Sequence, residues 1–456
     1  MTDLALVSSL ALAAKHPDPA FPRFHPRPAQ GWINDPNGVS CIDGRYHVFF
    51  QYNPESARHS QIHWGHVSSA DLVHWEEHPV ALAPQADGPD SAGCWTGVVT
   101  LDDGVPTAAY SGVKDHGGHS QVVIARGSSD LVSWNQDGHV AASMPADPSV
   151  TAVRDPFIFR FNGSRYAIQG AGLADGRAAL LLYSVNDMEN WEYKGIWLTT
   201  ANPVAARYTP AEIWECPQLV EVPVASGGST WVAMFSLWLS GDDHEHANGV
   251  GHLIGSLMED PDSGLPVFTP VTGGKSDLGR DFYAPQIVQT SSSTPSALLW
   301  GWANEGPGRD GRRGRTQQEI DDAGWSGVLT HPRPLSVADG ALVVSPAPEV
   351  AAYRGRRVAS GASGSVAVPV FAEAMVTGSG PVSLVLGSGA GEQVVYSGSL
   401  DVGEELRIFI DASLVEVYRS GSVATTLRAY PAPGESWTLV VPADSAADVW
   451  ELALPS

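Results

Sequence analysis

Short apolar runs recur along the first two thirds of the chain at a nearly constant spacing, and each run follows a turn-forming residue. This pattern predicts a series of hairpin turns that lead into strands. The turns are expected at Gly44, Gly104, Gly163 and Gly228. A second signal has the same rhythm, because an Asp is followed four residues later by a tryptophan. The pairs are Asp71 with Trp75, Asp130 with Trp134, and Asp187 with Trp191. Repetition of this kind predicts an array of one structural unit of about 60 residues.

Acidic residues return with the same rhythm. Asp35, Asp155 and Glu215 occupy three of four positions that lie 60 residues apart, and Trp95 occupies the fourth. Taken singly, each acidic residue reads as part of a tight turn or an ion pair, since Asp-Pro and Asn-Gly pairs set the backbone angles of turns. Three unrelated turns would not be expected to lie at the constant spacing of a repeated unit. We therefore expect the three carboxylates to occupy equivalent places in successive units and to converge near one axis.

A unit of about 60 residues that holds short strands and a fixed tryptophan is typical of a β-propeller blade. A fifth unit is predicted from Asp281–Pro285, from a strand over 297–302 and from a late strand pair within Gly324–Leu335 that helps to close the ring. After Ser345 the pattern changes to about eight short strands, which is typical of a β-sandwich. We predict an all-β protein, with a five-bladed β-propeller over residues 1–340, a linker over 341–355 and a C-terminal β-sandwich over 356–456.

Composition agrees with this interpretation, because 48 Gly and 34 Pro in 456 residues give a turn-rich chain. The formal net charge of −24 argues against nucleic acid or an anionic membrane surface as a partner. No run approaches the roughly 18 apolar residues of a transmembrane helix. Residues Leu4–Ala14 are apolar, but Asp3 precedes them where a signal peptide needs positive charge. The 3 scattered cysteines suit no disulfide framework, so we expect a cytoplasmic protein.

Carboxylates that converge in a funnel of sugar size suit glycoside hydrolysis, in which one acts as nucleophile and another donates a proton to the leaving oxygen. Trp95, Tyr283 and Trp302 would stack on sugar faces at the rim of this funnel, although each also fits an ordinary core position. The cluster Asp242–His246 contains residue types that bind metals, but we interpret it as a solvated loop. We therefore predict no metal and no cofactor.

Several motifs together resemble glycoside hydrolase family 32, which contains invertases, inulinases, levanases and fructan exohydrolases. The motifs are Trp32–Gly38, Phe50–Pro54, Trp64–His66, Arg154–Pro156, Glu215-Cys216, Asp281–Ala284, Arg407–Asp411 and Glu416–Tyr418. The resemblance implies a five-bladed propeller followed by a β-sandwich. It also implies that Asp35 is the nucleophile, Glu215 the general acid/base and Asp155 the stabiliser of the transition state. The implied fructose-pocket residues are Asn34, Gln51, Trp95, Thr96, Arg154, Asp281 and Trp302.

Two departures from the family pattern lie near the expected entrance of the pocket. His59 stands where members often have Trp, and Trp95-Thr96-Gly97-Val98 stands where they have a Ser-Gly-Ser-like segment. The leaving-group preference is therefore open. The leading hypothesis is a retaining β-fructofuranosidase that acts on sucrose and short fructo-oligosaccharides. The alternatives are an exo-levanase or inulinase, a fructosyltransferase, a sucrose-6-phosphate hydrolase, and a carbohydrate-binding propeller without catalysis. The sequence pattern predicts no particular oligomeric state.

Overall fold

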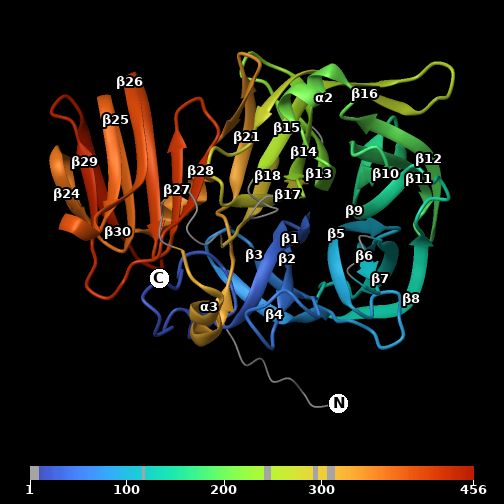
Figure 1. The fold of residues 1–456 in the computed structure, drawn as a ribbon, viewed down its shortest axis with the longest axis horizontal. Helices are drawn as coiled ribbons and strands as arrows, with labels where there is room; N and C mark the ends of the chain where they lie inside the picture. Colours follow the sequence, from blue (N-terminus) through green and yellow to red (C-terminus); the bar gives the residue numbers. More distant parts are fainter. Residues whose placement is uncertain (1–9, 116–118, 241–247, 291–295, 306–313, 456) are drawn as a thin grey trace.

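The computed structural model describes residues 10–115, 119–240, 248–290, 296–305 and 314–455. Five sheets stand around a common axis, and a further group of strands packs against one side of this ring (Figure 1). The innermost strands contact one another in a closed circle. These strands are β1 (Gly31–Ile42), β5 (Gly93–Asp102), β9 (Val150–Phe161), β13 (Ile213–Pro223) and β17 (Phe282–Gln289). The predicted five-bladed propeller is confirmed.

Each blade is a meander that runs from the axis outward. The first continues through β2 (Arg45–Asn53), β3 (His63–Ser69) and β4 (Trp75–Leu82), and the second through β6 (Val105–Val113), β7 (Gln121–Gly127) and β8 (Trp134–Ala142). The third continues through β10 (Ser164–Leu173), β11 (Ala178–Asp187) and β12 (Asn190–Thr199), and the fourth through β14 (Ser229–Trp238), β15 (Val250–Glu259) and β16 (Pro266–Lys275). The fifth contains β18 (Ala297–Ala303), β20 (Val328–Leu329), β21 (Arg333–Ala338) and β22 (Ala341–Val344).

The hairpin between the first two strands of a blade has the same backbone in four blades. At Asp43-Gly44, for example, both residues have positive φ, 50° and 78°. Two successive residues with positive φ form the type I′ turn, whose twist matches that of the paired strands. The same geometry recurs at Asp103-Gly104, Asn162-Gly163 and Gly227-Gly228. The hairpins expected from these glycines are therefore confirmed.

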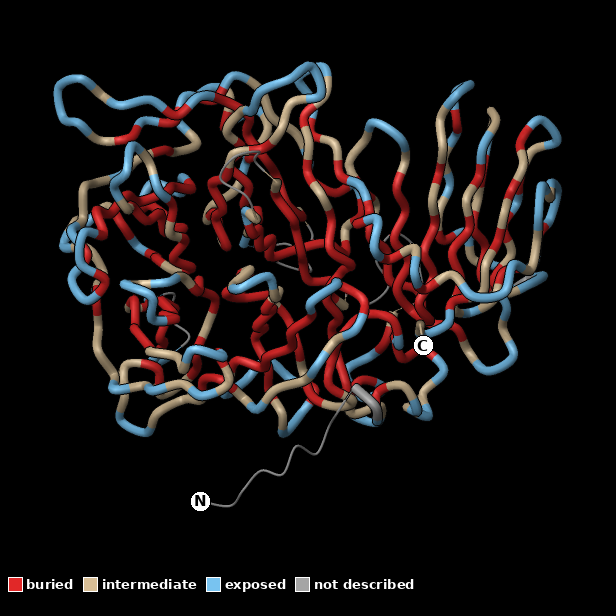
Figure 2. Tube along the Cα trace, turned by 180° about the vertical axis from the view of Figure 1, so that it is seen from behind, coloured by how far each residue is buried: buried red, intermediate tan, exposed pale blue. Residues whose placement is uncertain are grey.

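The Asp of the second repeated signal caps the turn between the third and fourth strands. The carboxylate of Asp71 accepts from the backbone N–H groups of Val73 and His74, at 3.0 and 2.8 Å. Trp75 then begins β4. Buried residues follow the inner and middle strands of the blades, whereas the turns are exposed (Figure 2).

Every innermost strand is interrupted by a β-bulge at the same level. In β1, two residues between Ile33 and Pro36 face a single residue of β2. The two extra residues of the five bulges are Asn34-Asp35, Trp95-Thr96, Asp155-Pro156, Cys216-Pro217 and Ala284-Pro285. A bulge bends the strand and turns its side chains to new directions. Proline is tolerated there because its missing N–H is not needed by the ladder.

The bulges correct the alignment that the constant spacing suggested. Asp155 holds the first bulge position, but Asp35 holds the second, and Glu215 is the residue before the bulge. Relative to Asp155, Glu215 is therefore one residue earlier and Asp35 one residue later, so the three acidic residues are not strictly equivalent. The reason is that corresponding bulge positions in successive blades are separated by unequal numbers of residues. Counting the residues between one acidic side chain and the next does not detect this difference.

The ring is closed by a short parallel bridge. Strand β19 (Trp325–Ser326) pairs with Gly31 and Trp32 at the start of β1. It follows helix α3 (Gln317–Ala323), which begins with a capping box and ends at Gly324 in the left-handed conformation. The buried Arg27 donates hydrogen bonds to the carbonyl oxygens of Gly31, Ser326 and Gly327. The segment predicted as one late strand pair thus divides its pairing between the first and fifth blades.

The C-terminal strands form the predicted β-sandwich, at the left of Figure 1. They are β23 (Arg354–Ala362), β24 (Gly364–Val368), β25 (Phe371–Leu386), β26 (Gln393–Asp411), β27 (Leu414–Arg419), β28 (Thr425–Arg428), β29 (Trp437–Val441) and β30 (Ala446–Leu452). Leu384, Ile408 and Trp437 lie in its apolar core. The predicted domain limits stay predictions, and β22 lies within the stretch that was expected to be linker.

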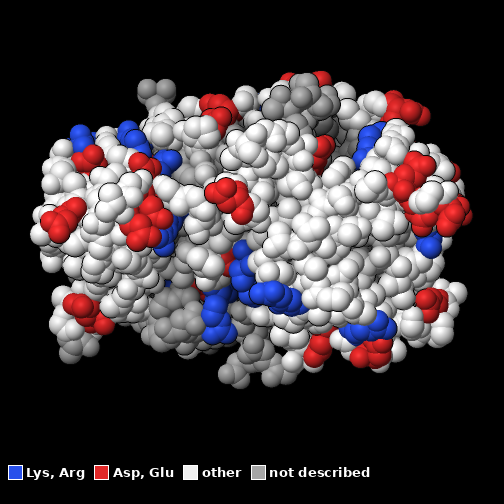
Figure 3. All heavy atoms as spheres, turned by 90° about the horizontal axis from the view of Figure 1, so that it is seen from above, with Lys and Arg blue, Asp and Glu red and all other residues white. Residues whose placement is uncertain are grey.

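Short helices complete the chain: α1 (Leu10–Ala13), α2 (Pro203–Tyr208) and the 3₁₀ segments η2 (Pro348–Tyr353) and η3 (Gly389–Gly391). Among the described residues, none of the helices has the length and apolar character that crossing a membrane requires. On the face seen in Figure 3, acidic side chains are dispersed in small groups among uncharged ones.

Candidate active site

The three acidic residues come from three of the innermost strands, at or beside their bulges. Asp35 is half-buried in β1, and Asp155 in β9 is only 4% exposed. The side chain of Glu215 in β13 is 13% exposed. Asp155 has φ of 61°, a conformation that is strained for a residue with a side chain. The bulges therefore bring carboxyl groups from distant parts of the sequence to one level of the propeller.

Asp35 is held by donors on both of its oxygens. Its Oδ2 accepts from the Thr96 hydroxyl at 2.5 Å and from the Gln51 amide at 3.0 Å. Its Oδ1 accepts from the Asn34 amide at 3.1 Å, and the orientation of that amide is fixed by the Trp32 indole, which donates to Asn34 Oδ1 at 2.9 Å. Three of the predicted pocket residues thus contact the carboxylate predicted as the nucleophile.

Cys216 joins two of the carboxyl groups. Its Sγ lies 3.4 Å from Asp35 Oδ2 and 3.6 Å from Asp155 Oδ2, and its backbone N–H donates to Asp155 Oδ2 at 2.9 Å. Burial and the nearby charge of Asp35 raise the pKa of Cys216, so it remains a thiol that can donate. Cys216 belongs to one of the motifs that resemble family 32, but its residue type alone predicts no role for it. Its position next to Glu215 was the available signal.

Glu215 is held by one residue from each neighbouring blade. The Arg154 guanidinium lies 3.2 Å from Glu215 Oε1, and the Tyr283 hydroxyl donates to Oε2 at 2.8 Å. Burial and the charge of Glu215 raise the pKa of Tyr283 well above its ordinary value, so its hydroxyl keeps the proton that it donates. Tyr283 was expected to be a stacking residue at the rim, whereas here it contacts a carboxylate.

The carboxyl groups differ in their electrostatic environments. Burial raises the pKa of Asp35, although its hydrogen bonds from Thr96, Cys216 and Asn34 oppose the shift. Burial and the negative charge of Glu215 raise the pKa of Asp155 to about 8, against the opposing effect of Arg154. Acidic groups whose environments separate their pKa values are suited to different tasks in one reaction.

Aromatic rings lie beside the carboxylates. The Trp32 ring is in contact with Trp302 at 5.8 Å and with His59 at 6.0 Å between centroids, and His59 also contacts Trp95 at 5.7 Å. Trp302 packs with Cys216 and Tyr283. His59, the residue that departs from the family pattern, thus lies between two tryptophans and is itself exposed.

Asp281 has a different setting. Its side chain is buried, and its Oδ2 accepts from the backbone N–H of Arg428 in β28 at 2.8 Å. It therefore lies where the propeller contacts the sandwich. Its role in a fructose pocket stays a prediction, as do the roles of the other predicted site residues.

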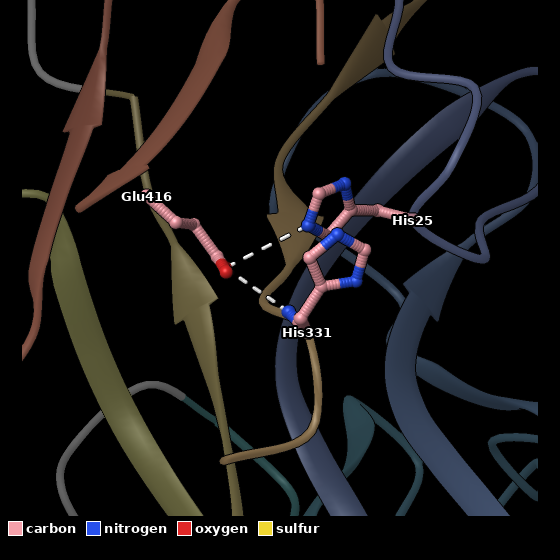
Figure 4. A group of neighbouring side chains, drawn as sticks. All are labelled: His25, His331 and Glu416. Atoms are coloured by element: carbon pink, nitrogen blue, oxygen red, sulfur yellow. Dashed lines mark hydrogen bonds and ion pairs between the residues drawn. The ribbon is translucent and has the colours of Figure 1, made fainter. Parts of the chain in front are cut away.

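A separate group of His25, His331 and Glu416 has residue types that bind metals (Figure 4). Arg333, however, pairs with Glu416 Oε1 at 3.0 Å, and the backbone N–H of His331 donates to the same oxygen at 3.0 Å. His25 donates to Asp411 at 2.6 Å. The negative charge is thus already compensated, and the group serves as an ion-pair network between propeller and sandwich. The cluster Asp242–His246 lies outside the described residues.

Three carboxyl groups gathered by the inner strands of a five-bladed propeller, joined to a β-sandwich, fit a class of glycoside hydrolases in which paired carboxyl groups do the chemistry. The model of the glycosyl hydrolases family 32 N-terminal domain matches residues 25–346. The chain belongs to glycoside hydrolase family 32, as its motifs indicated.

The chain resembles several known members of the family. It is 30% identical over 443 residues to a sucrose-6-phosphate hydrolase of Zymomonas mobilis, with 91% of this chain and 80% of the relative covered. It is 30% identical over 354 residues to a raffinose invertase of Escherichia coli, with 75% and 68% covered. The structure of a β-fructofuranosidase of Bombyx mori matches with a TM-score of 0.79 over 98% of this chain and 97% of that one. At 24% identity, this last likeness concerns the fold.

Proposed function

We propose that the chain is a retaining β-fructofuranosidase that hydrolyses terminal non-reducing β-D-fructofuranosides such as sucrose and short fructo-oligosaccharides. The observation that carries this proposal is that Asp35 and Glu215 have different hydrogen-bonding and ion-pair partners. Asp35 is fixed by four side-chain donors, whereas Glu215 lies between a cation and a phenol. Family membership and the names of the relatives support the substrate class.

The reaction proceeds in two displacements. Asp35 attacks C2 of the fructosyl unit while Glu215 gives its proton to the glycosidic oxygen, and the C2–O bond breaks. Glu215, now ionised, takes a proton from water, and the water oxygen attacks C2 and releases Asp35. Asp155 stabilises the positive charge that develops on the fructosyl ring.

Stereochemistry tests the two-step mechanism. A nucleophilic Asp35 requires a carboxyl separation of roughly 5 to 5.5 Å from Glu215, whereas inversion requires about 6.5 to 9.5 Å to admit a water. Proton NMR during the first turnovers should therefore show β-fructose before mutarotation. α-Fructose as the first product would refute the assignment of Asp35 as nucleophile.

A second candidate function is hydrolysis of sucrose 6-phosphate. The observation that favours it is the name shared by several relatives, among them the protein of Zymomonas mobilis. Initial rates on sucrose and sucrose 6-phosphate, measured side by side, decide between the two substrates. A kcat/KM on the phosphorylated sugar that is tenfold higher or more would favour the second candidate.

Rates on inulin and levan test the remaining alternatives, and the ratio of transferred to released fructose at high sucrose concentration tests a transferase. The described cysteines, Cys41, Cys94 and Cys216, are free. Free thiols support our proposal of a cytoplasmic location, where thiols stay reduced.

A further inference from the structure

Thr96 contacts the nucleophile more closely than any other residue of the pocket, and its surroundings fix where its proton points. It holds the second bulge position of β5 and is 1% exposed. Its Oγ1 has three polar neighbours: the Gln51 amide at 2.7 Å, the Asn37 amide at 3.3 Å and Asp35 Oδ2 at 2.5 Å. The direction of the single hydroxyl proton follows from what these neighbours can accept.

Two of the three neighbours turn an amide NH₂ group to Thr96 and act there as donors. Gln51 turns its NH₂ group to Thr96 and Asp35, because its oxygen in that place would face the carboxylate. Asn37 places its oxygen against two N–H donors, the Gln51 backbone at 3.2 Å and the Trp64 indole at 3.1 Å, so its NH₂ group faces Thr96. The hydroxyl therefore accepts from both amides, and Asp35 is the one neighbour to which it can donate.

The two oxygens of Asp35 consequently differ. Oδ2 accepts from Thr96, Gln51 and the Cys216 thiol, whereas Asn34 is the one side-chain donor to Oδ1 among the described residues. A carboxylate oxygen has about two lone-pair sites. Three donors saturate Oδ2, while Oδ1 keeps a lone pair for bond formation.

We propose that Thr96 is a positioning residue that holds Oδ2 of Asp35 and so makes Oδ1 the oxygen that bonds to the substrate. The inference rests on the proposed function. In the first step a bond forms between Oδ1 and C2, the C2–O bond to the leaving group breaks, and the leaving oxygen takes the proton of Glu215. Oδ2 becomes the carbonyl oxygen of the ester and keeps its three donors.

Thr96 has unequal effects on the two steps. In the second step Asp35 leaves C2 and regains its negative charge, and a donor on Oδ2 stabilises that charge. In the first step the same donor stabilises the charge that Asp35 gives up. Loss of the hydroxyl is therefore expected to slow release of the fructosyl group more than its attachment, so that the ester accumulates.

The test compares Thr96→Val, which has nearly the same shape without the hydroxyl, with Thr96→Ser, which retains it. For Thr96→Val on sucrose we expect a kcat about tenfold lower, a lower KM, and an acid limb of kcat/KM moved up by about one pH unit. Thr96→Ser should restore all three values. A Thr96→Val enzyme whose acid limb is unmoved and whose KM is not lowered would overturn the proposal.

A second measurement decides the matter even if Thr96→Val does not fold. Glu215→Gln, supplied with an aryl β-fructofuranoside whose leaving group needs no proton, should accumulate the ester, because the base of the second step is missing. A crystal structure of this ester should show C2 bonded to Oδ1, with Oδ2 still in contact with Thr96. A bond from C2 to Oδ2 would overturn the proposal.

These results also separate this inference from the proposed function. A wild-type enzyme inert on every β-fructofuranoside would overturn both. An active wild-type enzyme that forms β-fructose first, combined with either contrary result above, would overturn the role of Thr96 alone.

Discussion

Replacing Asp155 with Asn is expected to stabilise the folded protein at alkaline pH and to leave its stability nearly unchanged in acid. Burial and the charge of Glu215 raise the pKa of this carboxyl from 3.8 to about 8. In the unfolded chain it ionises near its ordinary value, so between these two pH values the folded state holds more protons than the unfolded state. Stability must then fall as pH rises through this window. An amide cannot ionise and does not incur this cost.

The size of the effect follows from the shift. One pKa unit corresponds to about 1.4 kcal/mol, so the shift from 3.8 to about 8 destabilises the folded state by up to about 6 kcal/mol above pH 8. Coupling among the three carboxyl groups makes this an upper bound. The hydrogen bond from the Cys216 N–H can be kept by the amide oxygen of Asn, and any change in it is the same at every pH.

Thermal unfolding followed by tryptophan fluorescence at pH 5, 7 and 9 measures the effect. We expect the Tm of Asp155→Asn, relative to wild type, to rise by several degrees between the lowest and highest pH. Asp262→Asn is the matched control, because it removes the same charge from an exposed position. A Tm difference that is equal at all three pH values, or equal in the two variants, would refute the reasoning.

Three further predictions concern other groups. Asp35→Ala should abolish turnover while the circular dichroism spectrum is retained, and a kcat near that of wild type would remove its role as nucleophile. Glu215→Ala should lower kcat on sucrose by about 10² to 10⁴ and lower it less on an activated aryl fructoside; equal losses on both substrates would contradict its role as general acid. Burial lowers the pKa of His25, but hydrogen bonds to Asp411 and Glu416 raise it to about 9, so the pairing stabilises the fold below pH 6.5 and is lost as pH rises through 9. His25→Gln should therefore melt below wild type at pH 6 and at the same temperature near pH 10, and a constant difference would count against this ion pair.

Local features of the fold could be predicted from the sequence because local chemistry produces them. A type I′ turn needs positive φ at two successive residues, and Asp-Gly or Asn-Gly supplies them wherever the pair occurs. The predicted strands after Gly44, Gly104 and Gly163 therefore begin as expected. The regular spacing of these turns predicted the repeated blades of the propeller. The motifs around Asp35 and Glu215 indicated the family.

Features that depend on the pairing of distant strands could not be predicted. The one-residue offsets of Asp35 and Glu215 depend on bulges, which are defined only by the register of the partner strand. The thiol of Cys216 gains its place between two carboxyl groups from a bulge as well. The contact of Asp281 with β28 depends on how the sandwich packs on the propeller, and no pattern within either domain encodes that packing.

The parallel bridge that closes the ring has a further consequence. Gly31 and Trp32, which pair with β19, lie in the same strand as Asp35 and only a few residues before it, and Trp32 itself orients Asn34. Separation of the first and last blades would thus pull directly on Asp35. The ring cannot open between β1 and β19 without disturbing the active site. The rate of thermal inactivation should therefore equal the rate at which the ring opens.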